Sequence, residues 1–292
     1  MRTVRAVAEL RSAMSAERKA ERSIGLVPTM GALHEGHLSL IRRARESCDV
    51  VVVSLFVNPT QFAPGEDLDA YPRDERHDAE LAAAAGADLL FAPAVGEIYP
   101  DGFSTAVEVG GLTEVLEGAQ RGPEHFRGVT TVVAKLFNLV GPDVAFFGRK
   151  DAQQALVVAR MARDLDFPVR IEVCPTVREP DGLALSSRNA YLRPPERRRA
   201  VALHRALVAA ERSVAEGERD AHAVARAARD AMEPYGVEPE YLELVSPDTL
   251  SPVATIDGET LLAVAARVGA ARLIDNTTVR PGRAPDNGRY TS

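Results

Sequence analysis

The sequence SIGLVPTMGALHEGHLSLIRRARESCDVVVVSLFV, residues 23–57, decides the fold. Residues 23–28 are mostly apolar and predict a short buried strand, while residues 33–47 carry apolar side chains at helical spacing. Residues 49–57 form an almost unbroken β-branched run, which is typical of a parallel strand buried on both faces. The stretch therefore predicts a strand, a helix and a second parallel strand in succession.

The same alternation continues as far as residue 176. The further strands are predicted at residues 88–93, 143–148 and 169–175, and the further helices at residues 78–85, 128–141 and 151–165. Strands that alternate with helices imply right-handed crossovers between parallel neighbours. Residues 1–176 are therefore predicted to form an α/β domain with a doubly wound, Rossmann-like parallel sheet.

The pattern changes over residues 177–292, where an irregular polar stretch precedes two helices and three β-like runs. The helices are expected at about residues 195–216 and 219–233, and the runs at residues 240–246, 260–268 and 271–277. Gly269 makes the last two runs a candidate hairpin. A second, smaller α+β domain is predicted, with a loose tail from Pro281.

The composition narrows the class of protein. The chain has 292 residues and a net charge of −7, which argues against a general nucleic-acid binder because such proteins usually carry a basic face. Cys48 and Cys174 fit neither a disulfide framework nor a zinc site, so a cytoplasmic location is expected. No signal peptide and no run of roughly 20 apolar residues are found in the sequence, so no membrane partner is expected.

Two histidines stand where the first predicted helix opens. Pro28 ends the preceding strand and Gly31 permits a tight turn. His34 and His37 then share a helix face because they are three residues apart. Ligands bind at the carboxyl edge of a parallel sheet. Free N–H groups at a helix N-terminus favour an anion, and Gly36, which has no side chain, lets a ring or ribose approach the backbone. A nucleotide site is predicted here; the alternatives are two surface histidines with an incidental glycine, or a zinc pair without a nearby third ligand.

Two further motifs carry polar groups suited to phosphate. In GRKD, residues 148–151, Lys150 can reach a phosphate and Asp151 can accept from ribose hydroxyls or simply cap the next helix. In LSSRN, residues 185–189, two hydroxyls and a guanidinium in a row can form an oxyanion clamp or belong to an ordinary polar linker. The residues alone leave both alternatives open.

Six motifs in order make a more specific pattern. They are PTMGALHEGHLSL, FVNPTQF, YPR, FRGVTTVVAKLFN, FFGRKDAQQ and LSSRNAYL, and the match that they mark extends over most of residues 24–192. In this order they resemble the pantoate–β-alanine ligase (pantothenate synthetase) family, part of the nucleotidyltransferase superfamily with an H-x-G-H motif. The resemblance implies that ATP and pantoate give pantoyl adenylate and pyrophosphate, and that β-alanine then displaces AMP to give pantothenate for coenzyme A. It also implies a homodimer, and Mg²⁺ held mainly by the phosphates.

The resemblance assigns roles to individual residues. The catalytic residues would be His37, His34, Lys150, Ser186 and Arg188. ATP would be bound by Met30, Gly31, Ala32, Leu33, His34, Glu35, Gly36, His37, Gly148, Arg149, Lys150, Asp151, Val177, Leu185, Ser186, Ser187 and Arg188. Pantoate would be bound by Gln61, Gln154, Pro28 and Met30. Residues 1–176 would thus bind nucleotide and pantoate, and residues 177–292 would close over the site.

Further assignments concern two other segments. Asp78 is expected near the Mg²⁺–pyrophosphate side, although family members often have two adjacent acids where this chain has His77 and Asp78. His125 and Arg127 are expected to cover the site or fix their loop. These residues stay expectations from the resemblance alone.

Two other functions compete with a ligase. A nucleotidyltransferase would use the same histidines to leave AMP or CMP on a phosphorylated acceptor, and a regulatory module would bind ATP without turnover. Gln61 and Gln154 favour the ligase, because neutral amides suit pantoate and offer no cluster of positive charge for an acceptor phosphate.

Overall fold

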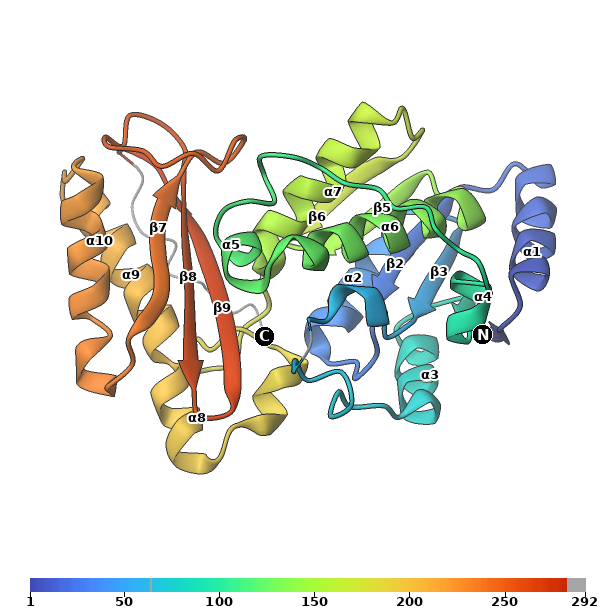
Figure 1. Ribbon diagram of the computed structural model, residues 1–292, viewed down its shortest axis with the longest axis horizontal. Coiled ribbons are helices and arrows are strands. Elements are labelled where there is room, and N and C mark those ends of the chain that lie inside the picture. The colour runs from blue at the N-terminus through green and yellow to red at the C-terminus, as the bar shows by residue number, and fades with distance from the viewer. Residues whose placement is uncertain (64, 283–292) are drawn as a thin grey trace. The chain divides into compact units, whose positions relative to one another are not determined.

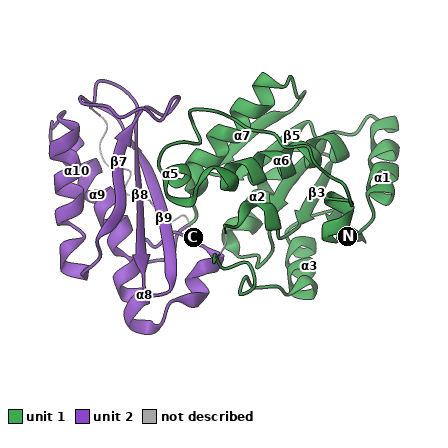
Figure 2. Ribbon diagram, viewed as in Figure 1, with its two compact units in different colours: residues 1–177 green, residues 178–292 purple. Residues whose placement is uncertain are grey.

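The computed structural model describes residues 1–63 and 65–282. The chain divides into two units, Met1–Val177 and Arg178–Ser292, which Figure 2 colours separately. Residues 283–292, most of the tail predicted to be loose, lie outside the described residues.

The first unit is built on a parallel sheet (Figure 1). Within residues 1–63 and 65–177 its strands are β1 (Arg2–Val4), β2 (Ile24–Thr29), β3 (Val50–Leu55), β4 (Leu89–Phe91), β5 (Val144–Gly148) and β6 (Arg170–Cys174). Their order is β1-β4-β3-β2-β5-β6, and every neighbouring pair is parallel. The predicted doubly wound α/β fold is confirmed. The order reverses between β2 and β5, which makes the carboxyl ends of these two strands the ligand-binding position of such sheets.

Both faces of the sheet are covered, as the β-branched run in β3 predicts. Alternate residues of a strand point to opposite faces. Val50 and Val52 belong to the core that also contains side chains of α1, α6 and α7. Val51 and Val53 belong to the core formed with α2 and α3.

The helices of this unit follow the predicted order with some differences in length. They are α1 (Val7–Lys19), α2 (Glu35–Ser47), α3 (Glu75–Ala84), α4 (Val95–Ile98), α5 (Glu117–Arg121), α6 (Pro123–Val140) and α7 (Ala152–Asp164). Helix α6 begins five residues before the predicted start at residue 128, because Pro123 occupies the first turn, where its fixed φ suits a helix. It ends at Val140, close to the predicted end, and its C-cap Gly141 has the left-handed conformation that favours glycine.

The second unit joins helices to an antiparallel sheet, as predicted. Its elements are α8 (Pro194–Ala200), α9 (Ala202–Ala215), α10 (Ala221–Asp230), β7 (Pro239–Val245), β8 (Thr260–Val268) and β9 (Ala271–Val279). Gly269, in the left-handed region, lies in the turn of the β8–β9 hairpin. The segment predicted as one helix over residues 195–216 is two, α8 and α9, although no glycine or proline marks the break at Val201.

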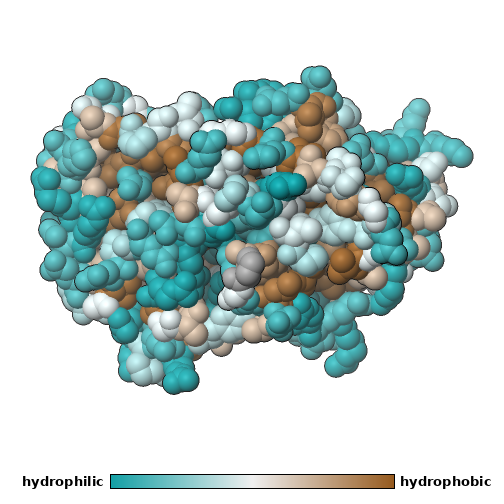
Figure 3. Space-filling model, in the orientation of Figure 1, coloured by the Kyte–Doolittle hydropathy of each residue, from teal (hydrophilic) through white to brown (hydrophobic). Residues whose placement is uncertain are grey.

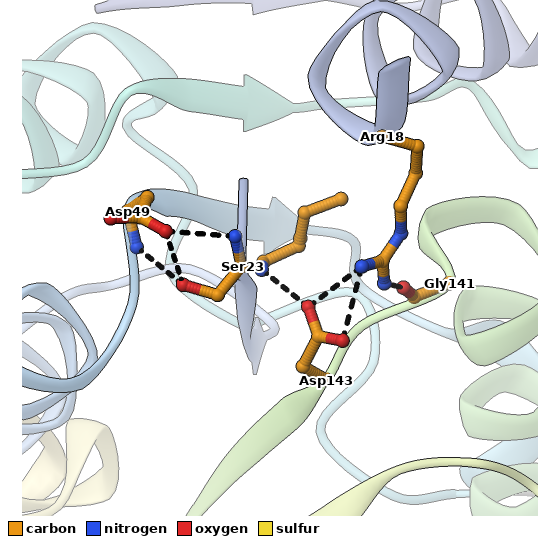
Figure 4. Close-up of polar contacts among 6 residues, drawn as sticks. Arg18, Ser23, Asp49, Gly141 and Asp143 are labelled. Carbon is orange, nitrogen blue, oxygen red and sulfur yellow. Dashed lines mark hydrogen bonds and ion pairs between the residues drawn. The ribbon is translucent and has the colours of Figure 1, made fainter. Parts of the chain in front are cut away.

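A polar network ties the amino ends of the central strands together (Figure 4). Asp143 accepts from Arg18 Nη1 at 2.8 and 3.0 Å and from Ile24 N at 2.7 Å, and Arg18 also donates to the Gly141 carbonyl. Ser23 donates to Asp49 from N and Oγ, and these bonds lower the pKa of the Asp49 carboxyl. The network lies at the sheet edge opposite the strands' carboxyl ends.

Asp143→Ala is expected to lower the free energy of unfolding by about 1–3 kcal/mol, because Ile24 N and Arg18 lose their acceptor. Urea denaturation measures the change. Asp164→Ala is the matched control, since Asp164 forms only an exposed ion pair with Arg163 among the described residues, worth about 0–1 kcal/mol. Equal losses in the two variants would contradict the prediction.

Surface apolar residues are dispersed. Brown residues on the face in Figure 3 are divided by teal hydrophilic ones, as is ordinary for a protein surface. Within residues 1–63 and 65–282, no helix is long and apolar enough to span a membrane.

Candidate active site

The imidazole pair lies at the turn between β2 and α2. His34 is the N-cap of α2, so the helix begins where the sequence predicts. His34 Nδ1 accepts from Gly36 N at 3.1 Å, and His37 Nδ1 accepts from His34 N at 3.3 Å. The ring centroids are 4.1 Å apart. Because each Nδ1 accepts a backbone N–H, each neutral ring carries its proton on Nε2, and the pair offers two Nε2–H donors.

Both imidazoles are held neutral. Burial, aided by the positive charge of Lys150, lowers the pKa of His34 to about 4. Burial, aided by the neighbouring His34, lowers the pKa of His37 to about 3. At neutral pH the rings therefore act as uncharged hydrogen-bond donors whose partners fix their orientation.

Acid is expected to destabilise the folded chain through these two rings. An unfolded imidazole titrates near pH 6.5, whereas the folded rings titrate near about 4 and about 3. Below pH 6.5 the unfolded state therefore binds more protons, and stability falls by up to about 1.4 kcal/mol per pH unit for each ring. Urea denaturation at several pH values measures the free energy of unfolding, which should change less steeply with pH in the double variant His34→Asn, His37→Asn. Equal pH dependence in the two proteins would contradict the assignment of the lowered pKa values to these rings.

The GRKD motif, at the carboxyl end of β5, lies close enough to the two histidines for its charges to act on them. Gly148 ends β5, and a Cβ built there would meet no atom of the described residues within 4 Å. Lys150 Nζ lies 3.3 Å from Asp151 Oδ1, and both charges act on His34 and His37. Asp151 makes no side-chain capping bond to α7 within the part of the chain that the structure describes. The capping alternative is therefore not realised, and the motif meets the histidines at the point where the strand order reverses.

The first predicted pantoate residue, Gln61, is held in a buried network. Gln61 is 8% exposed, and its Oε1 accepts from Asn58 Nδ2 at 3.0 Å. Its Nε2 lies 3.3 Å from Met30 Sδ, which joins the loops after β2 and β3. Since one N–H of the Gln61 amide donates to Met30 Sδ, its second N–H is the donor that it can offer to a ligand.

The other predicted pantoate residues also belong to the first unit. Gln154 lies in the first turn of α7, and its amide makes no hydrogen bond with the described residues. Pro28 is the penultimate residue of β2, two positions before Met30. Phe62, which follows Gln61, contacts Tyr71 edge-on at 6.0 Å between ring centroids. An unpaired amide can bind a small hydroxy acid, and this role of Gln154 stays a prediction.

Sequence reasoning missed the residue that organises this loop. Asn58, 1% exposed, also donates to the Gly128 carbonyl at 3.1 Å, and its Oδ1 accepts from Thr60 Oγ1 at 2.9 Å and Tyr99 Oη at 2.8 Å. The one signal was its place after β3 and before a proline, which is typical of an N-cap. Asn58 therefore holds the Gln61 amide in place.

His125 fixes the loop that carries Gln61, whereas the expected role of Arg127 in covering the site stays a prediction. His125 Nδ1 lies 2.9 Å from the Gln61 carbonyl, and its Nε2 lies 3.0 Å from Arg121 Nη1. Burial and the charge of Arg121 lower the pKa of His125 to about 4, so the ring is neutral and donates to Gln61. Arg127 is exposed and pairs with Glu124 at 3.4 Å.

The LSSRN motif lies in the second unit. Ser186 caps a short 3₁₀ turn, Ser187–Tyr191, and its Oγ accepts from Arg188 N at 3.3 Å. Arg178 pairs with the buried Asp275 at 2.6 and 2.9 Å and fixes the base of this loop. The motif is thus an ordered turn with half-buried Leu185, Ser187 and Arg188, and Val177 is the last residue of the first unit.

The surroundings of Asp78 do not fit its expected role as a Mg²⁺ ligand. Both carboxylate oxygens accept backbone N–H groups, Oδ2 from Ala32 at 2.9 Å and Oδ1 from Leu33 at 2.7 Å. A cation there would face two N–H dipoles aimed at the same oxygens, which is unfavourable. The donor arrangement does not fit a metal ligand, and no group of three or more His, Cys, Asp or Glu suited to a metal occurs among residues 1–63 and 65–282.

Known proteins match the chain along nearly its whole length. A family model described as pantoate-β-alanine ligase matches residues 2–278. The pantothenate synthetase of Moorella thermoacetica is 56% identical over 280 residues, covering 96% of this chain and 99% of the relative. The crystal structure of the pantothenate synthetase from Thermus thermophilus has a TM-score of 0.92 at 52% identity, covering 96% of this chain and 100% of that chain.

A third relative carries ligands. The pantoate-β-alanine ligase from Francisella tularensis, solved with β-γ ATP and β-alanine, has a TM-score of 0.80 at 33% identity and covers 95% of this chain and 97% of its own. The resemblance predicted from the six ordered motifs is therefore confirmed, and the chain belongs to the pantoate–β-alanine ligase family.

Proposed function

We propose that this chain joins pantoate to β-alanine in an ATP-dependent reaction that releases AMP and pyrophosphate. The observation that carries the proposal is the pair of Nε2–H donors on His34 and His37, beside Lys150, where the strand order reverses. Family membership supports the same reaction. The substrates ATP and β-alanine are those of the ligand-bound relative.

In the first step, a pantoate carboxylate oxygen bonds to the α-phosphorus of ATP, and the bond from that phosphorus to the bridging oxygen of pyrophosphate breaks. Negative charge grows on the phosphate oxygens, and His37 and His34 donate to them with Lys150 supplying positive charge. Neutral donors already oriented by backbone bonds need little reorganisation as the charge develops.

In the second step, the β-alanine nitrogen bonds to the pantoyl carbonyl carbon. The carbon–oxygen bond to AMP breaks, AMP leaves with the electron pair, and the nitrogen, which attacks as the free amine, gives up one proton to solvent. Gln61 and Gln154 hold the pantoyl group, with Pro28 and Met30 against its methyl groups. Holding both reactants in one geometry supplies much of the rate in such transfers.

Further contacts to ATP are proposed on the family pattern. The backbone of residues 30–36 and Gly148 would lie along the nucleotide, with Asp151 on the ribose. Main-chain groups of Val177 and Leu185 would face adenine, and Ser186, Ser187 and Arg188 would bind the outer phosphates. Closure of residues 178–292 over the nucleotide stays a prediction. Small-angle scattering with and without ATP tests it, and unchanged compactness would count against it.

Three finer points are also proposals. Mg²⁺ would arrive with the ATP phosphates, because the donor set around Asp78 does not fit the ion. The chain would work as a homodimer, which analytical ultracentrifugation tests. It would act in the cytoplasm, in line with its two free, buried cysteines.

The proposed reaction predicts exchange of radiolabelled pyrophosphate into ATP when pantoate is present and β-alanine is absent. The exchange requires a reversible adenylate, so its absence would remove the mechanism. Supplying all three substrates should release AMP together with pantothenate. A nucleotidyltransferase would form a dinucleotide-like product without an amine, and a regulatory module would release no AMP.

A further inference from the structure

The buried carboxylate of Asp78 has no part in the chemistry described above. It belongs to α3 and is 2% exposed, yet it bonds a segment of the chain about forty-five positions earlier. That segment, residues 30–33, links the end of β2 to the imidazole pair. A buried charge needs hydrogen-bond partners, and here both partners are main-chain N–H groups of that segment.

The bonded segment has an unfavourable backbone. Gly31 has a φ of +92° and Ala32 a φ of +50°, so two successive residues lie in the left-handed region. For a residue other than glycine this conformation is unfavourable by about 1–2 kcal/mol. A Cβ on Gly31 would lie 3.0 Å from Asp78 Oδ2, which shows how closely the carboxylate packs against the turn. The turn therefore depends on contacts from outside the segment.

The turn sets the geometry of both rings. Leu33 immediately precedes His34, the N-cap of α2, and the His34 N–H in turn orients the His37 ring. The charges that act on the imidazole pKa values are those of Lys150 and Asp151 and, for His37, that of His34; Asp78 is not among them. Asp78 thus affects the positions of the two rings through its hydrogen bonds to the backbone.

We propose that Asp78 is a positioning residue for adenylate formation: by clamping Ala32 N and Leu33 N it fixes the turn that aims the Nε2–H groups of His34 and His37. The inference rests on the proposed function for its consequence in catalysis. The dependence of the ring geometry on Asp78 does not rest on that function and can be tested without any substrate.

The test uses Asp78→Asn in the full chain. Asparagine has the same shape but replaces one acceptor by an NH₂ donor that opposes a backbone N–H. Pyrophosphate exchange is expected to fall by about 10-fold to 100-fold. The Mg²⁺ concentration giving half-maximal exchange at saturating ATP should stay unchanged. In substrate-free protein, the ¹⁵N resonances of His34 and His37 should move, because their backbone bonds are disturbed.

Asp143→Asn is the matched control. Asp143 also accepts a backbone N–H, that of Ile24, but at the amino edge of the sheet. It should lose stability while the exchange rate per folded molecule and the ring resonances stay unchanged. If Asp78→Asn leaves the rings unmoved, or if raised Mg²⁺ restores its exchange rate, the positioning role is wrong.

A measurement on the unaltered chain covers the case in which the Asp78 variant does not fold. Titration with Mg²⁺ alone should leave the Asp78 carboxyl ¹³C resonance in place, and the Ala32 and Leu33 amides should be protected from hydrogen exchange. Movement of the carboxyl resonance, or unprotected amides, would overturn the proposal. Failure of exchange in the unaltered chain would refute the proposed function and leave these readouts intact.

Discussion

Replacing His37 by alanine is expected to lower pantoate-dependent pyrophosphate exchange by about 10²–10³ with the fold retained, because one oriented donor to the charge that develops on phosphate is lost. His37 Nδ1 is bound by His34 N, so Nε2–H is the group available to a ligand. The His37 pKa of about 3 means that the ring donates as a neutral group at neutral pH. Initial rates of exchange at saturating ATP and pantoate measure the loss.

Two further variants separate donation from packing. His37→Gln keeps an N–H donor of similar reach and should retain more activity than His37→Ala. His222→Ala removes an exposed histidine of α10 and should leave the rate unchanged. A near-normal rate for His37→Ala would show that this ring does not take part in adenylate formation.

The parts of the fold that could be predicted are those with long apolar patterns. The run in β3 specifies a strand buried on both faces, and the parallel sheet follows from repeated strand–helix alternation. Strand β1 was not predicted, because three residues carry too little pattern and the strand exists through its pairing with β4. The break at Val201 was not predicted either, since tertiary packing sets it without a local signal.

Some residues of the candidate site could likewise be predicted from the sequence, and others could not. His34, His37 and Lys150 could be predicted because their motifs are contiguous and their strand ends share one sheet edge. Asp78 and Asn58 could not be assigned their contacts, because those contacts join segments tens of residues apart. The positions of the imidazole protons also depend on backbone geometry that no motif specifies.

Gly128→Ala is expected to lower kcat/KM for pantoate by about 10²-fold, because it displaces the turn that carries Gln61. A Cβ at Gly128 would lie 2.5 Å from the Thr60 carbonyl oxygen and 2.6 Å from Gln61 N. These are backbone atoms, so the clash cannot be relieved by a rotamer change. Asn58, which donates to both Gln61 and the Gly128 carbonyl, would lose one of these bonds as helix and turn separate. Overpacking should also lower stability by about 1–3 kcal/mol.

The effect should fall on pantoate more than on ATP, because the imidazole turn is held from another side by Asp78. Calorimetric titration with ATP and exchange rates against pantoate concentration separate the two. Gly96→Ala is the control, since a Cβ at Gly96 meets no described atom within 4 Å. If Gly128→Ala loses stability but keeps its KM for pantoate, the Gln61 amide does not bind that substrate. A raised KM with intact ATP binding would instead mean that close contact between α6 and this turn sets the position of the acid.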